Sequence, residues 1–203
     1  MYSNLQPATP DMAPVASELI YLTMRQTADY LFGNDNARQI LARLFAMRSN
    51  RFSYQFSQVF SPSGEIAGLV VSYPGLLLKS LELPTALRVV QAIGIFGFFR
   101  FVRKALPLLN VKEAEPDEYY ISNIAVLPAQ QGHGLGSQML QLIEKKAREQ
   151  GYKKISLTVD IENEGAYALY CRTGFEVVET SIIESLQRRT GYGGSYRMVK
   201  TLI

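Results

Sequence analysis

Three glycines at alternate positions, Gly132, Gly134 and Gly136, place the strongest constraint on how this chain folds. An extended apolar run at residues 124–127 precedes them, and a helical pattern over residues 137–150 follows. Glycine adopts positive φ without strain and lets backbone amides come close to a ligand. The loop opens onto a helix N-terminus, where unpaired N–H groups and the helix dipole favour phosphate. The sequence therefore predicts a strand–loop–helix unit that holds a pyrophosphate group.

Two well-known phosphate-binding loops do not match this spacing. The P-loop needs G-x-x-x-x-G-K-[ST], and no lysine followed by serine or threonine comes after these glycines. The dinucleotide-binding loop needs G-x-G-x-x-G, whereas here a glycine stands at every second position. The spacing therefore disfavours both nucleotide-binding classes.

The loop sequence QGHGLG at residues 131–136 resembles the [Q/R]-x-x-G-x-[G/A] signature of the GCN5-related N-acetyltransferase (GNAT) superfamily. Residues 163–175, NEGAYALYCRTGF, resemble the second signature of that family, N-x-x-A-x-x-L-Y-x-x-x-G-F. The resemblance extends over nearly the whole chain and is most specific in residues 118–182. It implies one α/β domain over residues 1–203, with a mixed central sheet flanked by helices, and acetyl-coenzyme A (acetyl-CoA) as cosubstrate.

The resemblance also implies which residues contact acetyl-CoA. Backbone amides of the glycine loop would hold the pyrophosphate, and free backbone groups of a splayed strand would pair with the pantetheine arm. Asn163, at the start of a short helix, would cap that helix, contact the arm, or do both. The predicted set is Ile124, Ala125, Val126, Gln131, Gly132, His133, Gly134, Leu135, Gly136, Ser137 and Asn163. Because His133 lies in the phosphate loop, we expect a loop contact or solvent exposure for its side chain.

Acetyl transfer to an amine needs an acid for the departing thiolate and a base for the incoming ammonium. Tyr170 resembles the tyrosine that often serves as the acid in this family, and a phenol and an alkyl thiol have comparable acidity. Glu118 is the predicted base, because it begins a strand face that enters the site. Asp117 and Asp160 are alternative bases, and an amine that arrives neutral needs no strong base.

These residues together predict an N-acetyltransferase in which a primary amine attacks acetyl-CoA directly in a ternary complex. The acceptor is a small-molecule or peptide amine that the sequence does not specify. A transferase for longer acyl-CoA chains and a non-catalytic CoA-binding sensor are the alternatives. Cys171 follows Tyr170 by one position, about 100° around a helix, so a covalent acetyl-cysteine is disfavoured and a small buried thiol is expected.

Composition narrows the class of protein further. Of the 203 residues, 47% are hydrophobic and 19% are charged, which indicates an ordinary globular domain. A formal charge of +3 is too small to indicate a nucleic-acid partner. One cysteine and one histidine suggest neither a disulfide framework nor a metal site. Because no basic region followed by an apolar stretch opens the sequence, we expect a cytoplasmic location.

Residues 76–112 predict a helical insertion that borders the acceptor site or forms a homodimer interface. Within it, residues 89–102 are mostly apolar, about 14 residues against the ~20 that a spanning helix needs. We therefore expect a helix packed in the core or under a partner and no membrane span, with interfacial membrane contact as the alternative. Elsewhere, alternation predicts a strand at residues 52–56 that pairs with residues 66–72, and a mixed sheet overall.

Overall fold

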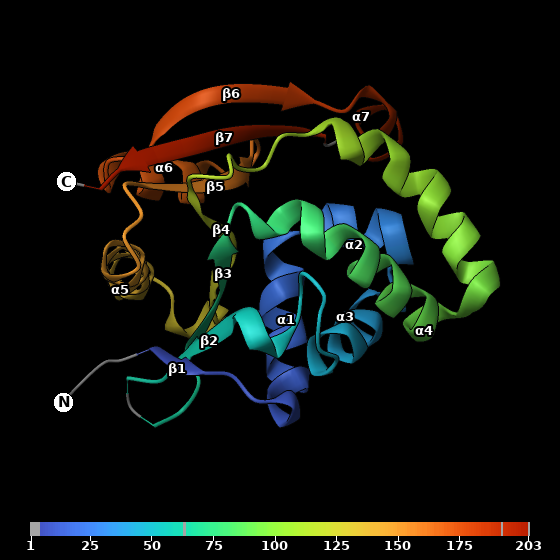
Figure 1. The fold of residues 1–203 in the computed structure, drawn as a ribbon, viewed down its shortest axis with the longest axis horizontal. Helices are drawn as coiled ribbons and strands as arrows, with labels where there is room; N and C mark the ends of the chain where they lie inside the picture. Colours follow the sequence, from blue (N-terminus) through green and yellow to red (C-terminus); the bar gives the residue numbers. More distant parts are fainter. Residues whose placement is uncertain (1–4, 63, 192, 203) are drawn as a thin grey trace.

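The computed structural model describes residues 5–62, 64–191 and 193–202, and one mixed sheet runs through them (Figure 1). Its seven strands lie in the order β1-β2-β3-β4-β5-β7-β6. The strands are β1 (Leu5–Pro7), β2 (Ser57–Phe60), β3 (Gly68–Pro74), β4 (Tyr119–Val126), β5 (Lys154–Asp160), β6 (Glu176–Ile182) and β7 (Gly194–Thr201). The predicted α/β fold with a mixed sheet is confirmed.

The parallel pair β4–β5 is joined by the crossover helix α5 (Leu135–Glu149), as the strand–helix–strand order predicts. The following strand, β6, does not lie beside β5. Instead β7 lies between them and pairs antiparallel with both. The order of elements in the sequence predicted the parallel pair. It did not predict that β7 lies between β5 and β6, because strands that are distant in sequence leave no local signal of their pairing.

Helices cover both faces of the sheet (Figure 1). On one side lie α1 (Ala13–Thr23), α2 (Arg25–Phe32), α3 (Ala37–Ala46) and α4 (Leu77–Ala105). On the other side lie α5 and α6 (Glu164–Arg172), and α7 (Glu184–Thr190) joins β6 to β7. Short 3-10 turns occur at Pro10–Met12, Tyr54–Phe56, Leu106–Asn110 and Pro128–Gln130. Each layer buries an apolar helix face, and burial of that kind provides most of the stability of helices in proteins.

Two core clusters, one on each side of the sheet, fix the position of β4. Leu41 and Phe45 of α3 share a cluster with Tyr120 of β4 on the first side, and Ile143 of α5 shares one with Ile121 of β4 on the second. All five residues are at most 1% exposed. Because β4 is held from both faces, the backbone of this strand is a rigid base for whatever binds at its end.

The strand predicted at residues 52–56 is wrong, and the polar residues around it explain why. The side chain of Asn50 accepts a hydrogen bond from Phe52 N at 2.9 Å and donates one to Leu44 O at 2.9 Å. Ser53 Oγ accepts from Gln55 N at 3.2 Å. Local bonds of this kind compete with a sheet ladder, so the chain turns here and the strand begins only at Ser57.

The insertion predicted at residues 76–112 is helical. Its prolines suggest a break in the helix at Pro84, but the break lies at Gly94. Pro84 lies inside α4, whereas Gly94 has a non-helical backbone with φ 73° and ψ 169°. Figure 1 shows the result as two helical arms that meet at the edge of the molecule. We call them the first arm (residues 77–93) and the second arm (residues 95–105).

This helix is longer than the predicted apolar stretch. Among the described residues, the segment Leu77–Leu109 has the length and hydropathy of a membrane-crossing helix. Its most apolar stretch of 18 residues has a mean hydropathy of 1.5, and 17% of that stretch is buried. The break at Gly94 divides it into arms that are each shorter than the ~20 residues of a spanning helix. The first arm also packs on α3 through Val89 and Ala92. Length and composition alone therefore do not make it a membrane span.

Candidate active site

The cleft at the centre of the molecule begins where β4 and β5 separate. Their parallel pairing covers three residue pairs and ends at Ile121 and Leu157. Beyond that point β4 continues along β3, and β5 continues along β7. A β-bulge accompanies the separation, since Ser122 of β4 has no partner between the pairs Ser72–Ile121 and Val71–Asn123. The two strands thus open a wedge whose β4 side has backbone groups that β5 does not use.

The glycine loop closes one end of this wedge. Gly132 and Gly134 have φ values of 82° and 74°, and Gly134 is the N-terminal cap residue of α5. A β-carbon built on either glycine meets no atom within 4 Å, so open space lies in front of both. Gln131 Nε2 donates to Val126 O at 3.0 Å and ties the loop to the end of β4. The loop has the backbone conformation and free space that a pyrophosphate cradle requires.

Together these parts form a cleft with a volume of about 1290 Å³. Most of the predicted residues line it: Ile124, Ala125, Val126, Gln131, Gly132, Gly134, Leu135, Gly136, Ser137, Asn163 and Tyr170. His133 is exposed, does not line the cleft, and places Nδ1 3.3 Å from Gln130 O. Any role of His133 in binding would therefore use its backbone amide.

Helix α6 brings two predicted residues to the cleft. Asn163 caps the helix, because its Oδ1 accepts a hydrogen bond from Ala166 N at 3.1 Å, so the predicted cap is confirmed. Tyr170 is 6% exposed and its ring lies 5.9 Å from that of Phe175. Burial raises the pKa of Tyr170 well above its usual value, so the hydroxyl stays protonated at neutral pH. Cys171 is exposed and does not line the cleft, so the expected burial of this thiol is wrong.

The placement of Glu118 argues against its predicted role as the base. Its carboxylate accepts two hydrogen bonds from Arg197 Nη2, at 2.5 and 2.6 Å, and a third from Glu115 N at 2.9 Å. Both side chains of the Glu118–Arg197 pair are buried, and Glu118 does not line the cleft. Removing one partner of a buried ion pair costs about 3–5 kcal/mol, which indicates a structural function. Arg197 comes 79 residues later in the chain, so the sequence did not show this pairing.

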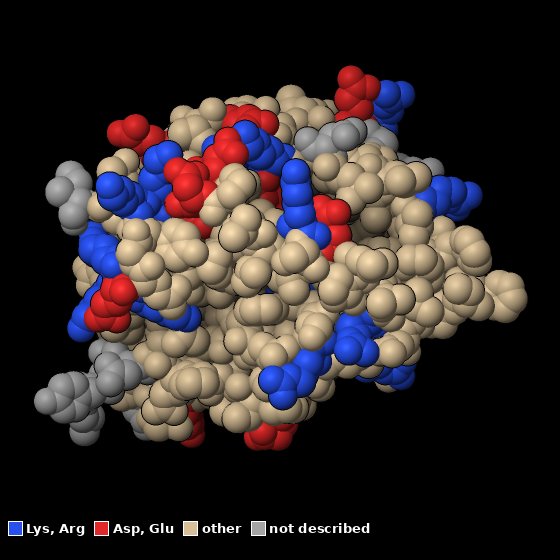
Figure 2. Space-filling view, viewed as in Figure 1, with Lys and Arg blue, Asp and Glu red and all other residues tan. Residues whose placement is uncertain are grey.

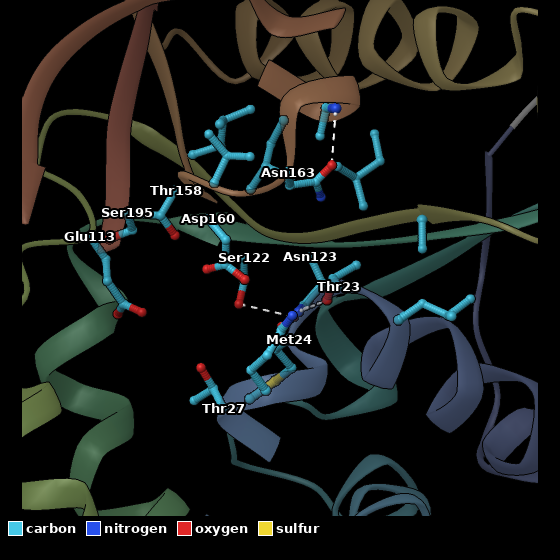
Figure 3. Close-up of a pocket in the computed structure, with 18 of the residues that line it drawn as sticks. Thr23, Met24, Thr27, Glu113, Ser122, Asn123, Thr158, Asp160, Asn163 and Ser195 are labelled. Atoms are coloured by element: carbon cyan, nitrogen blue, oxygen red, sulfur yellow. Dashed lines mark hydrogen bonds between the residues drawn. The ribbon is translucent and has the colours of Figure 1, made fainter. Parts of the chain in front are cut away.

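Of the three carboxylates that the sequence offers as the base, Asp160 is the one that lines the cleft. It is the last residue of β5, past the point where β4 and β5 separate, and Figure 3 shows its side chain beside that of Ser122. Burial, with a smaller contribution from the charge of Glu162, raises the pKa of Asp160 to about 6. Asp117 is exposed and bonded to Lys154 at 3.1 Å, away from the cleft. Of the three carboxylates considered from the sequence, Asp160 has the position and pKa of a general base.

A chain of polar side chains continues from β4 to α1 and was not predicted. Ser122 Oγ donates to Asn123 Oδ1 at 3.1 Å, and Asn123 Nδ2 donates to Thr23 Oγ1 at 2.7 Å (Figure 3). Thr23 Oγ1 donates in turn to Ile20 O at 2.7 Å. Two adjacent polar residues in the otherwise apolar run 121–127 were the signal available in the sequence. The chain fixes the bulged part of β4 against the end of α1.

The insertion borders the side of the cleft away from the glycine loop. Phe98 and Phe101 line it from the second arm, and Val89 lines it from the first. Arg51 and Glu113, which form an ion pair, add charge to this wall. Residues of the 76–112 insertion thus line the cleft, and a role in the acceptor site or in a dimer interface stays a prediction. Within the described residues, no group of three or more His, Cys, Asp or Glu side chains is arranged to hold a metal ion.

Comparisons with known proteins agree with this geometry. The model of the Acetyltransferase (GNAT) family matches residues 83–175, which include the glycine loop, β5 and α6. A solved acetyltransferase structure is 25% identical and covers 99% of this chain and 100% of its own, with a TM-score of 0.69. The chain contains a GNAT acetyltransferase domain, and its whole length has the GNAT fold.

Two further similar proteins support the fold of this chain and the match of its central segment. An N-acetyltransferase from Staphylococcus aureus Mu50 is 22% identical, with a TM-score of 0.72 over 96% of this chain and 98% of its own. GCN5-related N-acetyltransferase 6, chloroplastic, from Arabidopsis thaliana is 35% identical over 71 residues. That match spans 35% of this chain and 25% of the Arabidopsis protein. The curated relative is thus matched over only a quarter of its length.

Replacing Gly134 with valine is expected to weaken CoA binding at least tenfold. The branched side chain would enter the open space in front of the loop, removing one to two charge-assisted hydrogen bonds at ~1.5 kcal/mol each. Gly151→Val is the matched control, because Gly151 also has positive φ (84°) and open space but lies at the other end of α5. Calorimetry with CoA makes the comparison. Equal affinity in both folded variants would contradict the cradle.

Proposed function

We propose that this GNAT protein transfers the acetyl group of acetyl-CoA to a primary amine by direct attack in a ternary complex. The observation that carries this proposal is the wedge between β4 and β5, with the glycine loop at one end and both Tyr170 and Asp160 on its walls. An acetyltransferase from Bacillus subtilis, solved in complex with CoA, adds support. It is 17% identical over 98% of this chain and 97% of its own, with a TM-score of 0.55.

The glycine loop would bind the pyrophosphate of acetyl-CoA through its amides. The β4 segment Ile124–Val126 would pair with the pantetheine arm, because beyond Ile121 the edge of β4 that faced β5 is open. An N–H group of this edge would also donate a hydrogen bond to the thioester carbonyl and stabilise the negative charge that develops there. Asn163, already the cap of α6, stands beside the same wedge and would contact the arm.

Asp160 and Tyr170, on the walls of the cleft, would carry out the proton transfers. Asp160 would take a proton from the incoming ammonium, directly or through a water molecule, to give the neutral amine that attacks the carbonyl carbon. As the carbon–sulfur bond breaks, the thiolate of CoA would take the hydroxyl proton of Tyr170. The second proton that the amine nitrogen loses on becoming an amide would pass through solvent and restore this hydroxyl. The products are the acetylated amine and CoA. The raised pKa of Asp160, about 6, makes its carboxylate a stronger base than an ordinary aspartate and still ionised at pH 7.

The acceptor would bind between the polar wall at Ser122 and Asp160 and the apolar wall of α4. Carboxylates on this side of the cleft are Glu82, Glu113 and Asp160, and Glu113 is paired with Arg51. This balance favours a cationic amine with an apolar portion. Release of free thiol from acetyl-CoA, measured against a panel of amines that includes polyamines, aminoglycosides and peptides, tests the function. If CoA binds and no amine provokes thiol release, a non-catalytic CoA-binding function replaces this proposal.

Phe98 provides a test of the acceptor wall alone. It lines the cleft and is half-buried, whereas Phe99 beside it is 68% exposed and does not line the cleft. Phe98→Ser is expected to raise the KM for the acceptor about tenfold and leave the KM for acetyl-CoA unchanged, since one apolar contact is worth ~1–3 kcal/mol. Phe99→Ser is the matched control. Equal acceptor KM values in the two variants would remove α4 from the acceptor site.

A further inference from the structure

The bend of α4 carries a patch of exposed apolar side chains that the cleft does not use. Ile95, Phe96 and Phe99 are 52%, 86% and 68% exposed and follow directly on the break at Gly94. Figure 1 shows the two arms meeting at the far edge of the molecule, and Figure 2 shows a surface there that carries no charge. We call these three residues the apolar tip. Adjacent exposed aromatic residues on a projecting element are unusual in a monomer and indicate a surface that is covered in use.

The apolar tip is bordered by arginine side chains. Arg100 and Arg103 on the second arm are exposed. Arg43 Nη1 donates to Ala92 O at 2.8 Å, and Arg88 belongs to the first arm itself, so two more arginine side chains lie along this arm. Glu82 is the acidic residue of α4, and it lies on the cleft near the start of the first arm. The tip thus combines aromatic side chains with a border of positive charge.

Two partners could cover the apolar tip, a second copy of the chain or an anionic surface, and its border of positive charge favours the anionic surface. In a two-fold dimer the same patch meets itself, so the arginine borders of the two copies would lie against each other. An anionic phospholipid membrane has the complementary arrangement, with negative headgroups above an apolar layer. Aromatic residues inserted at that boundary and Lys or Arg beside them are the two contributions that hold peripheral helices on membranes.

We propose that the bend of α4 docks this protein on the surface of anionic phospholipid membranes. The apolar tip would enter the headgroup boundary, and Arg100 and Arg103 would contact the lipid phosphates. The arms do not cross the bilayer. The proposal is independent of the acetyl-transfer chemistry, because the apolar tip does not line the cleft.

The absence of tryptophan from the chain allows a direct test. In Phe96→Trp the new indole is the sole tryptophan and reports the polarity around the tip. We expect a blue shift of its emission with vesicles of equal parts phosphatidylcholine and phosphatidylglycerol, and at least tenfold weaker binding to phosphatidylcholine alone. Val178→Trp on β6, at a position that is 53% exposed, is the matched control and should show no shift. No shift for Phe96→Trp on anionic vesicles overturns the proposal.

The second test measures flotation with the same vesicles, using the wild type and variants that carry no added tryptophan. The double variant Phe96→Ser, Phe99→Ser should bind anionic vesicles at least tenfold more weakly, while Val178→Ser, Ile182→Ser should bind like the wild type. Arg100→Glu, Arg103→Glu should also lose binding, as should the wild type in high salt. If the Phe96 and Phe99 double variant floats like the wild type, docking does not use the tip. If the wild type is a stable dimer that this variant makes monomeric, the face belongs to a second copy and the membrane proposal fails.

Discussion

Replacing Asp160 with asparagine is expected to lower kcat/KM for the amine by a factor of ~10²–10⁴, the range that general base catalysis provides. The amide has the same shape and does not accept a proton. Affinity for CoA should stay the same, because the glycine loop is unchanged. Asp117→Asn is the matched control, since Asp117 is an exposed aspartate outside the cleft. Steady-state thiol release with any amine that proves to be a substrate gives the measurement.

The pH profile tests the same assignment without a change in sequence. The carboxylate acts as a base only when ionised, so kcat/KM should rise with pH through about 6 and then level off. In Asp160→Asn this rise should disappear. A rise at the same pH in the variant would assign it to a different group, and activity within threefold of the wild type would mean that the amine needs no base from the protein.

Stability provides the check that Asp160→Asn remains folded. The pKa of Asp160 is about 6 in the folded protein, above its ordinary value of 3.8, so the folded state holds this proton more tightly than the unfolded state. The free energy of unfolding therefore falls as pH rises from about 4 to 6, and this loss persists above pH 6. Asparagine has no such charge, so at pH 8 the variant should be at least as stable as the wild type. A loss of activity would then come from lost chemistry and not from unfolding.

Tyr170→Phe is expected to lower kcat by ~10²-fold with little change in the KM for acetyl-CoA. The hydroxyl is proposed to act as carbon–sulfur cleavage occurs, so its removal affects the transition state and not ground-state binding. Tyr167→Phe on the same helix is the matched control, because Tyr167 packs against Tyr196 and does not line the cleft. Turnover within a factor of about three of the wild type would mean that another group donates the proton.

The two predictions also separate the roles of the two residues. Because burial raises the pKa of Tyr170, its hydroxyl stays protonated through the pH range of the assay. Tyr170→Phe should therefore keep the rise of kcat/KM near pH 6 that belongs to Asp160. A variant that loses both rate and this inflection would show that the two groups are not independent.

Elements with strong local signals were predicted well from the sequence. Helix α5 (Leu135–Glu149) lies within two residues of the helical pattern predicted at residues 137–150, because its apolar residues recur with helical period and the glycine loop and Gly151 stand at its ends. The glycine loop, the cap at Asn163 and the crossover between β4 and β5 were also predicted, since each depends on residues close together in the chain. The cytoplasmic location and a homodimer stay predictions, the latter with its test described above.

Only the tertiary structure decided which carboxylate faces the cleft. Glu118 and Asp160 stand at the ends of two strands that lead to the site, and the strand pattern in the sequence favoured Glu118. In the folded protein Arg197 of β7 binds Glu118, whereas Asp160 lies beyond the last β4–β5 pair. The bulge at Ser122 and the break at Gly94 also depend on how distant elements pack. Residues close together in sequence determine helices, caps and turns. Whether a charged side chain pairs with a partner or faces the cleft depends on contacts between residues that only the complete fold brings together.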